Sequence, residues 1–296
     1  MAVNVLGMRI VYCQAQIARS NGMADQRDKV WIEQVRNRRD HREFVGPGDE
    51  YDVNAAMQFN LLTVLGLREY HKVLDIGCGS LRAGRLLIVY LLPGHYFGIE
   101  PEPWIVESAI EHEIGGDLIE LKSPSFSHNS DFLCDRFNQE FDYILAQGVF
   151  THAPTWQIRK CLLEVTKCMK SSSIFAASYM QGDENYEGDE WLYPRTSFYT
   201  PGRMREMVSS VGLISFPVDW PHPRGAKWIL LCKTENESKV LKLVEKANEF
   251  HLHEKLDELQ MKVYETEQAL ARLRAHPYVK IGMKINQLLR RLCPSK

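Results

Sequence analysis

Two carboxylates and two glycines stand close together in the first third of the chain. Asp75 is followed at intervals of two by Gly77 and Gly79, and Glu100 ends the next apolar run. Glycine has no Cβ, so the chain can turn tightly there and a ligand can lie against the backbone, Cys78 included. A carboxylate at the position of Glu100 can accept hydrogen bonds from both hydroxyls of an unphosphorylated ribose. The pattern predicts a site for a nucleotide-type cofactor.

The elements around these residues are those of an α/β corner. Val73, Leu74 and Ile76 predict a short buried strand, and residues 81–92 predict the helix that follows the glycine turn. A dinucleotide fingerprint would need a third glycine three residues after Gly79, where this chain has Arg82. The spacing therefore disfavours a dinucleotide.

This combination of an acid before G-x-G and a second acid after the next strand resembles the class I S-adenosylmethionine-dependent methyltransferases. The resemblance covers residues 51–233 and implies S-adenosyl-L-methionine as the cofactor. It implies that Asp75 and the backbone of the glycine turn hold the methionine end, that Glu100 holds the ribose, and that Arg82 meets a carboxylate of cofactor or substrate. A structural glycine turn in another kind of α/β protein is the alternative.

Further residues are assigned to the cofactor by the same resemblance. Asp131 and Phe132 match an acid that accepts from the adenine amino group and an apolar neighbour that covers the ring; an N-cap aspartate is the alternative. Tyr51 and Gln58 precede the cofactor strand, on a helix that in relatives closes over the methionine end. Plain packing explains them equally well. Gln147, at the end of a later strand, could bind the cofactor's amino group.

The candidates for chemistry are two histidines. Residues 141–146 are apolar apart from Asp142, which predicts a strand covered on both faces, and His152 falls in the loop after it. Ligands of doubly wound sheets lie beyond the carboxyl ends of the strands, so His152 is the first candidate for a general base. His222, in a proline-rich turn with Arg224, is the second. A structural role is the alternative for each.

The order of segments predicts an α/β, Rossmann-like, doubly wound sheet of seven strands, mostly parallel, with an antiparallel final hairpin. We expect N-terminal helices before it and a long C-terminal helix after it. The third strand is expected around residues 118–121. The acidic, aromatic segment 180–194, which includes Trp191 and Tyr193, is predicted to be a substrate lid rather than a plain solvated loop.

Composition narrows the function classes. With 36 basic and 38 acidic side chains the net charge is −2, and the N-P-P-Y type motif of base amino-methyltransferases is absent, so we expect no nucleic-acid partner. The seven cysteines include no CxxC pair, which predicts reduced thiols and no metal site. No membrane-spanning run or cleavage-like leader is recognisable, which predicts a cytoplasmic protein.

The C-terminal segment predicts association. From residue 238 to 275 there is no glycine or proline, and Leu252, Leu256, Leu259, Val263, Leu270 and Leu273 follow a and d spacing. An earlier set, Leu243, Ala247 and Phe250, lies in another register, which indicates a stutter. A helix of about 55 Å cannot be covered by one domain, so we expect a homo-oligomeric coiled coil; folding back on the domain is the alternative. Residues 277–296 read as a basic amphipathic helix that could lie peripherally on the inner face of a membrane.

The predicted domains are therefore 1–50, a helical extension; 51–236, the methyltransferase domain; 237–276, the coiled-coil helix; and 277–296, the basic tail. The expected reaction is O-methylation of a hydroxyl on a small molecule or saccharide, because an alcohol needs a base and His152 is placed to act as one. A protein acceptor is an alternative. So is a non-catalytic scaffold that works through its coiled coil and tail.

Overall fold

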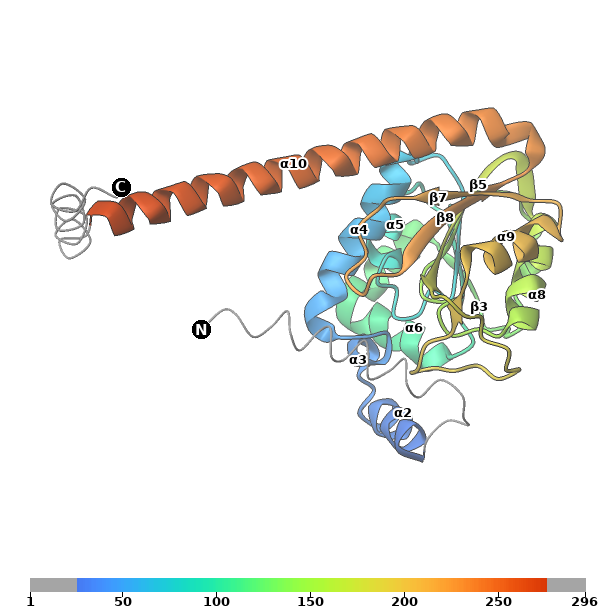
Figure 1. Ribbon diagram of the computed structural model, residues 1–296. Helices are drawn as coiled ribbons and strands as arrows, with labels where there is room; N and C mark the ends of the chain where they lie inside the picture. The colour runs from blue at the N-terminus through green and yellow to red at the C-terminus, as the bar shows by residue number, and fades with distance from the viewer. Residues whose placement is uncertain (1–25, 276–296) are drawn as a thin grey trace, which may run out of the picture. The chain divides into compact units, whose positions relative to one another are not determined.

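The chain forms a twisted mixed sheet between two layers of helices (Figure 1). The computed structural model describes residues 26–275. Its strands are β1 (Val73–Ile76), β2 (Tyr96–Ile99), β3 (Ser125–Ser127), β4 (Phe141–Ala146), β5 (Met169–Gln181), β6 (Phe198–Tyr199), β7 (Ile214–Val218) and β8 (Lys227–Cys232). They are ordered β3-β2-β1-β4-β5-β8-β7, and β6 pairs with β5. β8 is antiparallel to both neighbours and the other pairs are parallel. The predicted sheet type is confirmed.

Helices cover both faces of the sheet. They are α2 (Gln26–Arg38), α3 (His41–Phe44), α4 (Tyr51–Val64), α5 (Gly84–Tyr90), α6 (Pro103–Ala109), α7 (Gly116–Lys122), α8 (Thr155–Thr166), α9 (Pro201–Ser209) and α10 (Glu237–Ala275), with a π-helix at Ile110–Ile114. On β4, Ile144 and Ala146 belong to a core with α8 and α9, whereas Tyr143 and Leu145 belong to one with α4, α5 and α6. This alternation explains why the strand is apolar apart from Asp142.

Two sequence-based element assignments were wrong. Residues 118–121 lie in α7, and the third strand is β3, four residues later. Leu118 and Ile119 are half-buried while Leu121 is exposed, so this apolar run has a one-sided helical pattern. The helix after the glycine turn begins at Gly84 instead of residue 81, because Leu81 has φ of +55°, which is incompatible with a right-handed helix.

A buried acid anchors the N-terminal helices. Glu113, on the π-helix, accepts from Nη2 of Arg42 at 2.8 Å and contacts Nε2 of His41 at 2.9 Å. Arg85 lies 3.6 Å from the same carboxylate. The guanidinium groups of Arg42 and Arg85 stand 4.6 and 5.2 Å from the ring of Tyr51, the first residue of α4. This network fixes α3 to the start of the domain.

Helix α10 belongs to two units of the chain. Residues up to Asn248 form one compact unit and those from Glu249 form a second. Val240, Val244 and Ala247 are buried in the core on the α4 side, so the first part of α10 packs on the domain. The stutter predicted near residue 250 follows these buried positions in the sequence. None of the helices within residues 26–275 has the length and apolarity to cross a bilayer. The predicted tail helix at 277–296 lies outside the described residues.

We predict that Glu113→Gln lowers the free energy of unfolding by about 2 kcal/mol at pH 7, because charged hydrogen bonds are lost. Burial raises the pKa of Glu113, but the hydrogen bonds from Arg42 and His41 outweigh it and hold the pKa below the ordinary value. The stabilisation is therefore present above the unfolded-state pKa and is lost as the pH falls below about 4.5. Urea unfolding at pH 7 and pH 4 measures the difference. The exposed neighbour substitution Glu111→Gln is the control, and an equal effect of both variants would contradict the prediction.

Candidate active site

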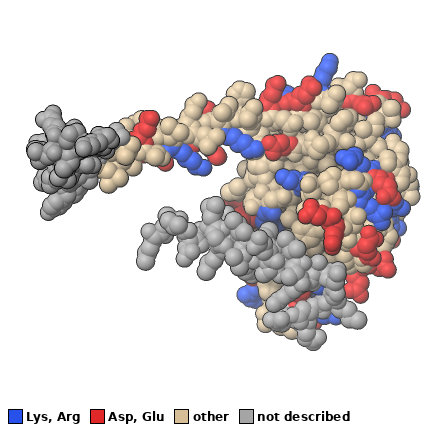
Figure 2. Space-filling model, viewed as in Figure 1, with Lys and Arg blue, Asp and Glu red and all other residues tan. Residues whose placement is uncertain are grey.

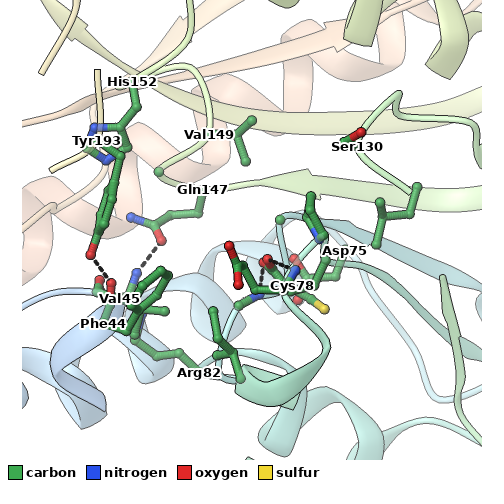
Figure 3. A pocket seen from close by; sticks show the side chains of 18 of the residues that line it. Phe44, Val45, Asp75, Cys78, Arg82, Ser130, Gln147, Val149, His152 and Tyr193 are labelled. Atoms are coloured by element: carbon green, nitrogen blue, oxygen red, sulfur yellow. Dashed lines mark hydrogen bonds between the residues drawn. The ribbon is translucent and has the colours of Figure 1, made fainter. Parts of the chain in front are cut away.

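A cavity of about 410 Å³ opens at the carboxyl ends of β1, β2 and β4 (Figure 3). Its volume is within the range of small-molecule sites. Most of the residues that sequence reasoning assigned to the site line this cavity: Gln58, Asp75, Gly77, Cys78, Gly79, Arg82, Glu100, Phe132, Gln147 and His152. They come from α4, from β1 and the glycine turn after it, and from the loops that follow β2, β3 and β4. The fold therefore brings together residues that are far apart in the chain.

The floor of the cavity is the turn that contains Gly77 and Gly79. Both glycines have positive φ, +64° and +52°, a conformation that disfavours other residues. A Cβ at Gly77 would lie 2.6 Å from Cγ2 of Val149, and one at Gly79 would lie 2.9 Å from Cγ1 of Val45. Glycine is thus required here by the backbone conformation and by the close approach of these side chains.

Two buried carboxylates stand beside the turn. Glu100 accepts from the N–H of Gly79 with one oxygen and from the N–H of Glu102 with the other, both at 3.0 Å. Asp75 accepts from the hydroxyl of Tyr96 at 2.8 Å. Burial raises the pKa of each carboxyl to about 7. Two hydrogen bonds use only part of the acceptor capacity of Glu100, which leaves lone pairs for a ligand.

Arg82 and Gln147 form a fixed polar pair on another wall. Arg82 donates to the carbonyl of Val45 at 3.1 Å and also to Oε1 of Gln147 (Figure 3). The amide nitrogen of Gln147 then donates to Nε2 of His222 at 3.0 Å. His222 is not among the residues that line the cavity, although Arg224 is. Burial, followed by repulsion from Arg224, lowers the pKa of His222 to about 3. Its position suits orientation of Gln147 better than proton transfer to a bound molecule.

His152 lines the cavity between the aromatic rings of Trp191 and Tyr193, with centroid distances of 5.6 and 5.1 Å. Its Nδ1 lies 2.6 Å from the carbonyl oxygen of Arg195, which can only accept, so Nδ1 carries the proton and Nε2 is the acceptor. Burial lowers the pKa of His152 to about 4. The ring is therefore neutral at pH 7. It is a weaker base than a histidine with an ordinary pKa, which would suit a general base better.

Tyr51 and Asp131 lie away from the cavity. Tyr51 is buried, and its hydroxyl donates to the carbonyl of Ser80 at 2.7 Å, which supports the glycine turn from behind. The side chain of Asp131 is exposed, and Asn129 and Ser130 line the cavity in its place. A direct contact with a molecule in the cavity is supported for neither Tyr51 nor Asp131.

Sequence reasoning missed the contribution of the N-terminal helices. Ile32 and Arg36 of α2 and Phe44 of α3 line the cavity, although residues 1–50 were predicted only as a helical extension with no part in the site. Phe44 stands 5.4 Å from Tyr193 between ring centroids, and its carbonyl accepts from the Tyr193 hydroxyl (Figure 3). The predicted lid segment thus supplies Trp191 and Tyr193, while its acidic side chains are exposed. The sequence signal that could have indicated this role is Phe44, an aromatic residue directly before the glycine- and proline-containing residues 45–48.

No family model matches the chain. Magnesium protoporphyrin IX methyltransferase (ChlM) from Synechocystis PCC 6803 with bound SAM is similar at a TM-score of 0.50 and 13% identity, over 72% of this chain and 100% of that chain. The fold is that of the class I S-adenosylmethionine-dependent methyltransferases. A TehB-like SAM-dependent methyltransferase from Corynebacterium glutamicum gives a TM-score of 0.45 at 14% identity, over 70% of this chain and 100% of that chain. The glycopeptide N-methyltransferase MtfA gives 0.47 at 8%, over 61% and 94%. At sequence identities this low, the similarity concerns the fold and says nothing of the substrate.

We predict that His152 keeps a neutral, Nδ1-protonated ring down to about pH 5, because burial opposes its charging. Nitrogen-15 NMR of the imidazole rings between pH 8 and pH 4 measures this directly. His152→Gln assigns the signal by its disappearance. Titration of that signal near pH 6.5 would contradict the environment described for His152.

Proposed function

We propose that the chain is an S-adenosylmethionine-dependent methyltransferase that methylates a hydroxyl of a small molecule or saccharide. The observation that carries the proposal is the pairing of the positive-φ glycine turn with the buried carboxylate of Glu100 at the end of the next strand. The turn exposes backbone to a ligand, and the carboxylate can accept from two adjacent hydroxyls. The shared fold supports the same assignment.

The residues around the cavity fit this cofactor. Asp75 would face its cationic end, which favours a charged carboxylate despite burial. Arg82 would bind the cofactor's carboxylate, and Phe132, with its positive φ of +59°, would cover the adenine ring. Gln147, held by Arg82 and His222, would bind the amino group. When bound, the cofactor supplies an electrophilic methyl group on a sulfonium.

The protein's part in the reaction is to position the acceptor and to remove its proton. His152 presents Nε2 as a hydrogen-bond acceptor because Nδ1 is committed to Arg195. It would orient the acceptor hydroxyl and take its proton as the oxygen attacks. The low pKa of His152 makes alignment the larger share of its contribution. Trp191 and Tyr193 offer apolar ring faces against which a sugar or aromatic ring can lie.

The second unit of the chain carries a self-association surface. Leu252, Leu256, Leu259, Val263, Leu270 and Leu273 are all exposed on α10. In the a/d register, Lys262 falls at g and Glu267 at e of the next heptad, which are the positions that pair between helices of a parallel dimer. Charged side chains of both signs are mixed along α10 and over the visible face of the domain (Figure 2). We propose a second copy of the chain as the partner, which the exposed a/d residues and the opposite charges at g and e support.

We predict that the full-length chain binds S-adenosylmethionine with one-to-one stoichiometry in calorimetry. Glu100→Ala should weaken binding at least about tenfold, or about 1.4 kcal/mol, because both the hydroxyl contacts and the brace on the turn are lost. Asp131→Asn, which alters an exposed acid after the neighbouring strand β3, should change the affinity less than about twofold. Absence of binding by the unmodified chain would refute the enzyme assignment.

We also predict that Leu259→Glu converts a dimer into a monomer, because a charge is placed in the apolar seam. Met261→Glu is the matched control, since this neighbour is equally exposed but lies outside the a/d positions. Light scattering coupled to gel filtration gives both masses. A monomeric unmodified chain, or a dimer that survives Leu259→Glu, would remove α10 as the interface.

A further inference from the structure

Charge is divided unevenly along the cavity wall. The acids that line it are Asp75, Glu100 and Glu102, which follow β1 and β2. Among the lining cations, Arg36 forms an ion pair with Glu102. Arg82, which follows the glycine turn, and Arg224, in the turn between β7 and β8, are the other two cations that line it. The cavity wall therefore carries acids from one part of the fold and cations from others.

Arg82 makes its hydrogen bonds to neutral groups, the carbonyl of Val45 and the amide oxygen of Gln147. Asp75 and Glu50 favour its charged form through electrostatic attraction without a hydrogen bond to it. Burial, followed by repulsion from Arg224, lowers the pKa of Arg82 to about 10. The side chain remains cationic at pH 7, and a second cation lies close to it.

Arg224 is the second cation. Its side chain is supported by the backbone of Gly46, since a Cβ there would lie 2.9 Å from Nη2 of Arg224. The ion pair it forms within the described chain is with Glu50, at 4.0 Å, which is too long for a hydrogen bond. Arg224 is also near enough to His152 to contribute to lowering the pKa of that ring. Arg224 thus places a guanidinium beside the proposed acceptor site, and the ion pair of this guanidinium with Glu50 is too long to be a hydrogen bond.

We infer that the methyl acceptor carries an acidic group, a carboxylate or a phosphate, which Arg224 binds while His152 engages the hydroxyl to be methylated. The inference rests on the proposed function and specifies its substrate class. Arg82 and Arg224 both line the cavity, and each repels the other's charge. Glu50 offsets part of this repulsion, but its ion pair with Arg224 is too long for a hydrogen bond, so the donors of Arg224 can still bind an anion in the cavity. The cofactor's single carboxylate would meet Arg82, next to the glycine turn, which leaves Arg224 for the acceptor. A guanidinium binds planar carboxylate and phosphate groups with paired hydrogen bonds.

The test uses the full-length chain saturated with S-adenosylhomocysteine. Binding of 4-hydroxybenzoate, inorganic phosphate and the neutral 4-hydroxybenzamide is measured by calorimetry or ligand-observed NMR. We expect at least one anion to bind about tenfold more tightly than the amide, and the stronger of the two identifies the acidic group. Equal binding of all three, or no binding of either anion, would overturn the inference.

Variants separate the acceptor role of Arg224 from other roles. Arg224→Gln should abolish the preference for the anion while changing the affinity for S-adenosylhomocysteine less than about twofold. Arg224→Lys, which keeps the charge, should retain part of the preference for the anion. Arg159→Gln, on the surface of α8, is the matched control and should retain the full preference. An Arg224→Gln chain that loses cofactor affinity would show that both arginines serve the cofactor, and a preference that survives in this variant would assign the anion elsewhere. Failure of S-adenosylhomocysteine to bind the unmodified chain would instead remove the proposed function itself.

Discussion

The contact on which the site depends most is the hydrogen bond from the N–H of Gly79 to the carboxylate of Glu100. It continues the register of the sheet, in which Ile76 pairs with Ile99, beyond the ends of the strands. The N–H groups of Gly77 and Cys78 both donate to the carbonyl of Ile99 as well. The turn is therefore fastened to the end of β2 by several backbone bonds and one side chain, and its shape follows from strand pairing.

Burial gives this arrangement an electrostatic cost. Burial holds the pKa of both carboxyls near 7, even though Arg82 favours the ionised form of Asp75, so both are only partly ionised at neutral pH. A positively charged ligand would favour the ionised forms and displace protons as it binds. The acids of the cavity wall thus suit a cationic molecule, whereas Arg82 and Arg224 suit anions. A molecule that carries both a positive and a negative charge, or a pair of oppositely charged molecules, would balance both the acids and the arginines of the cavity wall.

The parts of the site that sequence reasoning located are those fixed by local geometry. Asp75, the glycines and Glu100 lie next to strands whose apolar runs are unambiguous, so their spacing determines their place. Asp131 does not line the cavity, because Asn129 accepts from the N–H groups of Asp131 and Leu133 and turns the loop so that the Asp131 side chain is exposed. Ile32, Arg36 and Phe44 were missed because their role depends on tertiary contacts of short helices. The low pKa of His152 likewise comes from burial by a distant segment, which spacing does not reveal.

The cover of the cavity has consequences for access. It is built from α2, α3 and the segment around Tyr193, which are joined by the bond from Tyr193 to the carbonyl of Phe44, the Asp28 to Arg195 ion pair at 3.2 Å, and ring contacts. Opening the cover would break these contacts, whereas α3 is also held to the domain by the Glu113 network. Because Arg195 also accepts from His152 through its carbonyl, opening would alter the hydrogen bond that fixes the histidine tautomer. Closure of the cover and readiness of His152 are therefore coupled through one residue.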